Sequence, residues 1–307
     1  MLIKEESTEG TDSSPTVALN AIEAGNVKIG EKGTPEERNP CKRSGEPTPH
    51  VMGKRWGEAS FDVEYKGSGT KGTASRLADL FESMGLAETV SAGSSVTHAT
   101  SSALRKTVTL YVYDIPDTGS CVLRKLTGAI ATEGKMAIKA GSIMKMSIKL
   151  EGLYNDPADV ADPGEPTFDT TTPPIVESAQ FTLNSVTSLV LREMSLELGI
   201  KKAMRDDVSS AGGVKGFKNM EMNPSGSFSV EAVPVATYDW WSDWKAATSR
   251  QASIIIGSDN GNKMTITLPK VIAKDIEDQD FDGMLGKSVP FACYGDASNP
   301  SVQLKEE

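Results

Sequence analysis

The chain has 307 residues, enough for two ordinary domains that each bury a core. Its formal charge of −10 argues against a surface that grips nucleic acid phosphates, and its many glycines and prolines favour turns and strands over long helices. Cys41, Cys121 and Cys293 are too few and too far apart for a disulfide framework or a metal cluster. No secretory signal or membrane-spanning run is visible. We therefore expect a soluble protein made in a reducing compartment.

The first half of the chain begins with a polar segment and continues with strand and helix patterns. Residues 1–20 have little to bury, so we expect an N-terminal arm that becomes ordered only against a neighbouring subunit. Residues 60–64 (SFDVE) alternate between apolar and polar side chains, which predicts a strand. Residues 73–84 carry apolar side chains at helical spacing and stop at Gly85, which predicts a helix.

Two further strands are predicted at 107–113 and 143–151. In the second of them the apolar side chains all fall on one face: Met144, Met146, Ile148 and Leu150. This alternation is typical of an antiparallel sheet with one wet face. Residues 156–174 follow with five prolines and many Asp and Thr residues, which predicts an extended linker.

The second half repeats the pattern of the first. Residues 227–231 (SFSVE) match 60–64 at a spacing of 167, and Arg205 and Arg38 precede them at the same offset. A helix at 235–247, a strand at 252–256 and a closing strand at 288–291 follow in the same order, the last matching 147–150 at a spacing of 141. We therefore interpret the chain as a tandem duplication, with a first copy at 21–155 and a second at 175–307. Each copy is predicted to be mainly β with one helix.

Residues 278–283 (DQDFDG) resemble the opening of a calcium loop. The twelfth position of such a loop needs a bidentate Glu, and here it is Val289. Lys287 stands at the tenth position, where a cation would weaken coordination. We interpret the segment as an acidic turn that leads into the last strand.

The remaining candidate sites have plainer interpretations. His50 and His98 lack a catalytic context, and residues 67–72 (GSGTKG) lack the spacing of a phosphate loop. The tryptophans at 240, 241 and 244 predict a buried helix face or a subunit contact, with the first packing on the third. The lysines at 135, 139, 145 and 149 indicate a solvated strand face. No catalytic residue, cofactor or metal site is predicted, and no enzyme activity is expected.

Several segments follow one another along nearly the whole chain: "KEESTEGTDSSPT" followed by "ALNAI", "ASFDVEYKGSGTKGT", "LRKLTGAIATEGKMAIKAG", "IKLEGLYNDP" before the linker, and "NPSGSFSVEA". In this order they resemble the tail tube proteins of long-tailed bacteriophages. The Asp-x-Asp-Gly turn before the final strand is also similar. These are patterns of strands and turns, so their order along the chain carries the resemblance.

The resemblance implies a β-sandwich or barrel-like tube fold whose rings stack into a hollow tail, through which the genome passes on ejection. It implies a virion protein that assembles in the host cytoplasm, associates with itself, and has a tape measure protein and a tail terminator as partners, without a membrane. DNA would slide through the lumen without specific binding, so we expect a lumen that is not basic. Glu133, Glu151 and Asp282 are the predicted lumen-facing acids.

The duplication adds an expectation about symmetry. If each chain carries two ring units, three chains supply six equivalent positions, and a homotrimer with pseudo-sixfold symmetry results. The alternative is a ring of six chains in which one copy lines the lumen. The rival functions are another tube-fold part (a tail terminator, a baseplate ring or the tube of a contractile injection system) and a secreted tandem β-sandwich adhesin.

Overall fold

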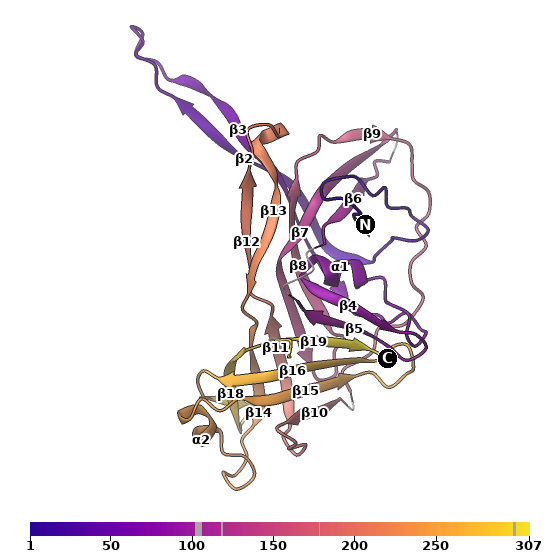
Figure 1. Cartoon of the computed structure of the whole chain (residues 1–307), viewed down its shortest axis with the longest axis vertical. Coiled ribbons are helices and arrows are strands. Elements are labelled where there is room, and N and C mark those ends of the chain that lie inside the picture. The colour runs from indigo at the N-terminus through magenta and orange to yellow at the C-terminus, as the bar shows by residue number, and fades with distance from the viewer. Residues whose placement is uncertain (102–105, 118, 178, 297–298) are drawn as a thin grey trace.

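The computed structural model describes the chain except for residues 102–105, 118, 178 and 297–298 (Figure 1). It is mainly β, with 54% of residues in strands and 5% in helices, and its strands pair antiparallel. This confirms the predicted fold class. Among the described residues, no helix has the length and apolar character needed to cross a membrane.

The elements alternate between long hairpins and short connections. Those of the first half are β1 (Leu2–Glu5), β2 (Ala24–Arg38), β3 (Thr48–Glu64), α1 (Ala78–Ser83), β4 (Leu86–Ser91), β5 (Ser95–Thr100), β6 (Val108–Asp114), β7 (Cys121–Lys139), β8 (Lys145–Leu153) and β9 (Ala158–Val160). Those of the second half are β10 (Gln180–Leu183), β11 (Leu191–Glu197), β12 (Ile200–Asp206), the 3-10 turn η1 (Ala211–Gly213), β13 (Val214–Met222), β14 (Ser225–Glu231), α2 (Trp240–Lys245), β15 (Arg250–Ile256), β16 (Met264–Ala273), β17 (Glu277–Phe281), β18 (Met284–Cys293) and β19 (Gln303–Glu306).

One continuous antiparallel sheet, here called the long sheet, runs through both halves. Its strand order is β2-β3-β8-β7-β11-β14-β18-β17, so four strands come from each half. The two sets meet where β7 pairs with β11. A second row of strands, β10-β15-β16-β19-β5-β4, also crosses between the halves, because the C-terminal β19 lies between β16 and β5.

The two halves of the long sheet have the same register. Phe61 in β3 lies directly opposite Ile148 in β8. The spacings of the sequence repeat carry these positions to Phe228 and Val289, and these two residues also lie directly opposite each other, in β14 and β18. The pairing that forms the first half of the sheet is therefore repeated, residue for residue, in the second.

The hairpin that opens each half is continuous in the first half and broken in the second. β2 and β3 form one long hairpin, whereas its counterpart divides into β11–β14 and β12–β13. The break includes Gly199, which has a φ of 57°, and a Cβ there would lie 2.2 Å from the carbonyl oxygen of Asn223. A glycine is needed at this position because a side chain would collide with the facing backbone.

One hydrophobic cluster fills the interior of both halves. Buried side chains from the long sheet, from the second row and from α1 belong to it, among them Phe61, Leu80, Phe81, Met136, Ile148, Phe228, Ile254, Ile266 and Leu304. The predicted alternation of residues 144–150 is confirmed, since all four of its apolar side chains are buried in this cluster.

Both helices are shorter than the sequence predicts. The helix expected at 73–84 covers only α1, because Ser75 is held outside it by its amide and hydroxyl, which both donate to buried Glu306 at 3.0 and 2.7 Å. The helix expected at 235–247 covers only α2, whose first turn is capped by Asp239, a carboxylate that accepts from the Ser242 amide.

The N-terminal segment folds within the chain, so the prediction of an arm ordered only by a neighbour is wrong. β1 pairs with β6, and Leu2 and Ile3 are buried. The carboxylate of Glu6 is also buried and accepts four hydrogen bonds, from the hydroxyls of Thr107 and Thr109 and from the amides of Gly10 and Gly128. Most of these partners lie about a hundred residues away in sequence, so the local polarity of the segment could not reveal them.

The Glu6 site predicts that the N-terminus stabilises the fold. In Glu6→Gln one acceptor oxygen becomes an NH₂ that faces two donors, and we expect the free energy of unfolding to fall by about 2–3 kcal/mol. Urea unfolding of the unassembled chain measures this. Glu9→Gln is the matched control, because Glu9 forms an exposed ion pair with Arg205 and its loss should cost less than about 1 kcal/mol. Equal losses in the two variants would contradict the prediction.

Candidate assembly surfaces

The two ends of the long sheet are open. In the described registers β2 pairs only with β3, and β17 pairs only with β18. Each of these strands therefore presents one row of backbone donors and acceptors without a strand partner. Open strand edges are templates for pairing with another chain. A sheet with two open ends can extend in both directions.

The distal part of the β2–β3 hairpin, residues 33–54, projects beyond the body of the molecule (Figure 1). We call this segment the arm. It exposes two large apolar side chains, Val51 at 54% and Met52 at 51% of their surface. Its counterpart in the second half, the β12–β13 hairpin, instead packs on the first half, where Val214 and Phe217 are buried against Ile130.

The long sheet has a polar face, made of the alternating side chains that point away from the main hydrophobic cluster. Carboxylates outnumber lysines on this face. The acids are Glu58, Asp62, Glu64, Glu133, Glu151, Glu193, Glu197, Glu231 and Glu277, and the bases are Lys28, Lys32, Lys135, Lys139, Lys145 and Lys149. Some are paired across strands, as in the ion pair of Lys149 with Glu58 at 3.0 Å.

The three acids singled out from the sequence lie in different surroundings. Glu133 is half-exposed on β7 and forms an ion pair with Lys135. Glu151, on neighbouring β8, is only 3% exposed, because the β12–β13 hairpin covers it and brings Lys202 into an ion pair with its carboxylate. Asp282 lies in the other half, fully accessible in the turn between β17 and β18 and 3.5 Å from Arg192.

The acidic segment at 278–283 was predicted to be a turn, but residues 278–281 belong to β17 and only Asp282 and Gly283 form the turn. Asp282 and Gly283 both have positive φ, of 56° and 92°, as the tight turn between β17 and β18 requires. Asp278 forms an ion pair with Lys287 across the hairpin, and Asp280 accepts from the amide of Gly283. The carboxylates therefore serve the turn.

The tryptophan segment is only partly buried. Trp240 is buried and packs on Tyr238, with ring centroids 4.5 Å apart, in place of the expected contact with Trp244. Trp241 and Trp244 are exposed by about two fifths, and the indole of Trp244 donates to the Lys274 carbonyl. Of the two predicted roles, the structure gives Trp240 the core role and leaves the other two side chains available for a subunit contact.

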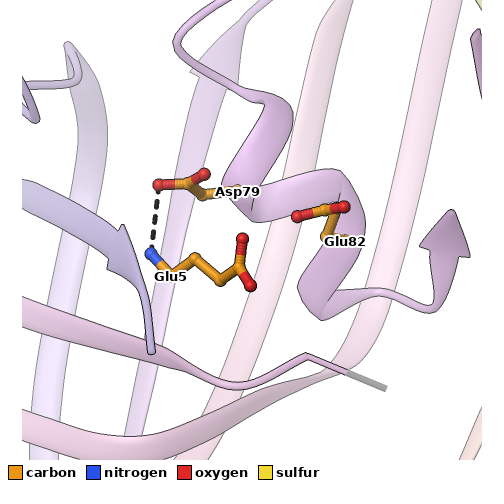
Figure 2. A group of neighbouring side chains, drawn as sticks. All are labelled: Glu5, Asp79 and Glu82. Carbon is orange, nitrogen blue, oxygen red and sulfur yellow. Dashed lines mark hydrogen bonds between the residues drawn. The ribbon is translucent and has the colours of Figure 1, made fainter. Parts of the chain in front are cut away.

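A cluster of three carboxylates is missed by the sequence analysis: Glu5 on β1 with Asp79 and Glu82 on α1 (Figure 2). Lys106 lies between them, 3.0 Å from Glu5 Oε2 and 2.9 Å from Glu82 Oε2, and Asp79 accepts from the Glu5 amide. Burial raises the pKa of Asp79 and that of Glu82. Burial alone would lower the pKa of Lys106, but its hydrogen bonds to Glu82 and Glu5 raise it overall. The cluster thus contains its own cation and fastens β1 to α1.

Comparison with known families identifies the chain's relatives. A family model described as phage tail tube protein matches residues 1–293, which is nearly the whole chain. No curated protein matches it. The match confirms the resemblance found in the sequence.

The acidic cluster predicts a pH dependence. Because burial raises the pKa of Asp79, the folded state holds this proton more tightly than the unfolded chain does, and ionisation lowers stability as the pH rises. Asp79→Asn keeps an oxygen for the Glu5 amide but removes the charge. We expect it to be more stable than the native chain at pH 7, with the advantage vanishing as the pH falls below the ordinary pKa of 3.8. Urea unfolding at several pH values measures both.

The control is a carboxyl group whose pKa is lowered by folding, so the expected change of stability with pH has the opposite sign. Hydrogen bonds from Ser147 and Asn26 lower the pKa of Asp62, so ionisation of this carboxyl adds stability above pH 3.8. Asp62→Asn should therefore be less stable than the native chain at pH 7, and this loss should vanish in acid. Parallel pH profiles for the two variants would contradict the assignment.

Proposed function

We propose that this chain, which belongs to the phage tail tube protein family, polymerises into stacked rings that form the hollow tube of a phage tail. The observation that carries the proposal is the long sheet with open ends at β2 and β17. Copies joined end to end through such a sheet satisfy both of its end strands once the sheet closes on itself. The genome would pass through the enclosed lumen on ejection.

The repeated register supports three chains per ring. Each chain supplies two sets of four strands with matching pairings, so three chains provide six similar units. Inside one chain the two units are already joined side by side through β7 and β11. We propose that the boundaries of the two units are residues 21–155 and 175–307, with 156–174 as the linker. Figure 1 shows this linker passing along the body of the molecule.

The polar face supports an acidic lumen. DNA that slides must not be held by its phosphates, and a face on which carboxylates outnumber lysines repels them. We propose Glu133 and Asp282 as lumen-facing acids. Glu151, expected with them, lies beneath the β12–β13 hairpin, and its charge is compensated by Lys202, so it adds little to this field. We further propose assembly in the host cytoplasm, with a tape measure protein setting the length of the tube and a terminator ending it.

Electron cryomicroscopy of the purified, assembled protein tests the architecture. We expect hollow tubes with three chains in each ring and two alternating units per chain. Six chains per ring would refute the trimer but not the tube. Isolated rings would indicate a terminator or baseplate part, and monomers alone at high concentration would contradict the tube itself.

The lumen charge predicts an effect on DNA. In Glu133→Lys with Glu193→Lys and Glu197→Lys, three acids of the polar face become bases, so tubes of this variant should retain a short DNA oligonucleotide at low salt and release it as salt rises. Co-sedimentation of labelled DNA with tubes measures retention, and native tubes should retain little. The control converts three loop acids, Asp162, Glu165 and Asp259, to lysine. Equal retention by control and variant tubes would contradict the location of the lumen.

A further inference from the structure

We propose that the ring closes where β17 of one chain pairs antiparallel with β2 of the next chain, in the register that β7 and β11 adopt inside each chain. The inference rests on the proposed ring and specifies the strand pairing that connects neighbouring chains, which we call the joint. Its partner is a second copy of this chain. The contact inside the chain is the template from which the contact between chains is derived.

The template is the junction between the two halves. Residues 135–139 of β7 lie opposite residues 193–197 of β11, with Ala137 opposite Ser195. Apolar side chains are buried on its inner side, among them Met136 and Leu196. On its polar side Lys135 and Glu197 lie opposite each other and form an ion pair at 3.9 Å.

β2 is the counterpart of β11. Lys28 lies opposite Ser60 of β3, just as Ser195 lies opposite Ser227 of β14, and the repeat equates Ser60 with Ser227. Lys28 therefore stands where Ser195 stands. Yet β11 has β7 on its other side, whereas β2 has no strand there in the described registers.

β17 is the counterpart of the end of β7. Lys135 lies opposite Ser147 of β8, and Glu277 lies opposite Ser288 of β18, at the repeat spacing. Gln279 therefore stands where Ala137 stands. Applied to a neighbouring chain, the template places Lys28 opposite Gln279. A bulge between Gly25 and Lys28 ends the residue-for-residue correspondence on that side of Lys28. Lys28 and Gln279 are both exposed in the single chain. The carbonyl of Ile29, beside Lys28, accepts from the Arg124 guanidinium at 2.5 Å, and the pairing must keep or replace this contact.

The same correspondence between the two halves predicts where the arm lies in the assembled ring. Its counterpart, the β12–β13 hairpin, lies across the polar side of the first half, where Phe217 packs near Ile130 and Leu153. The arm should therefore lie across the second half of the next chain. There the counterpart of Leu153 is Tyr294, a side chain that is 51% exposed and that the arm would cover. Val51 and Met52 of the arm would lose exposure in the same contact.

Disulfide cross-linking tests the register in assembled tubes. The variant carries Lys28→Cys and Gln279→Cys with Cys41→Ser. β2 and β17 lie at opposite ends of the long sheet, so these cysteines cannot meet within one chain. After oxidation we expect denaturing, non-reducing gels to show linked chains, ending at a closed species of three.

Two controls calibrate the reaction. Ala137→Cys with Ser195→Cys places the pair at the template position and should form an intrachain disulfide without linking chains. Lys28→Cys with Asp275→Cys shifts the register by four residues, on the order of 13 Å along a strand, and should not cross-link. Cross-linking in the shifted pair but not in the proposed one would overturn the register.

The outcomes separate the joint from the proposed function. Links that continue to six chains would support the joint and refute the three-chain ring. Tubes without links, although the template pair oxidises, would overturn the joint and leave the tube intact. If the cysteines prevent assembly, amide hydrogen exchange on native tubes decides. Residues 26–30 and 277–281 should gain protection on assembly, and no gain in either segment would overturn the joint.

Discussion

The assembly of this molecule depends on one constraint: the backbone groups at a strand edge need hydrogen-bond partners. A backbone amide or carbonyl at a sheet edge is satisfied only by water or by another strand, and a long bare edge invites uncontrolled pairing. In the described registers the long sheet leaves two such edges, β2 and β17, at its opposite ends. A family whose members build tubes thus includes a chain whose long sheet is incomplete at both ends.

The junction inside the chain and the proposed junction between chains differ in polarity. Inside the chain, Met136 and Ile138 of β7 are buried. At the counterpart positions β17 carries Asp278 and Asp280, which are exposed. An apolar edge left open on a free chain would associate indiscriminately, whereas a charged one keeps the unassembled chain dispersed. The permanent junction can therefore be apolar, and the one that must wait for a partner is polar.

Features that depend on local sequence patterns were predicted correctly, whereas features that depend on contacts between distant residues were missed. The alternation of residues 143–151 and the match of SFDVE with SFSVE are local patterns, and the structure contains the strands that they predict. The fold of the N-terminus depends on Glu6 meeting Thr107 and Thr109, and the start of α1 depends on Glu306 meeting Ser75, 231 residues away. The strand order, and with it the open edges, is likewise set by pairings between distant segments. The repeat was visible because the matching segments of the two halves also have matching partners, Phe61 with Ile148 and Phe228 with Val289.

The charges beside the junctions favour an alternating order of units around the proposed ring. On the polar side, β7 presents Lys135 and Lys139, and β11 presents Glu193 and Glu197, so these edges attract. β17 presents Glu277 and β2 presents Lys28, again of opposite sign.

If a unit stood beside another unit of its own kind, side chains of like charge would be brought together. A first unit beside another first unit would bring the lysines of β7 against Lys28, and a second unit beside another second unit would bring Glu277 against the glutamates of β11. In the proposed register Glu277 would lie directly opposite Glu197, and Lys28 would lie diagonal to Lys135 and Lys139. Like charges at such positions are unfavourable, so both wrong neighbours are penalised, whereas the right ones bring opposite charges together. Identical units could not discriminate in this way, because every junction would then be formed by the same two strand edges. Different edge charges on the two units would give them distinct neighbours, and a closed ring of distinct alternating neighbours contains an even number of units. Whole two-unit chains meet this condition, as the proposed ring of three chains and six units does.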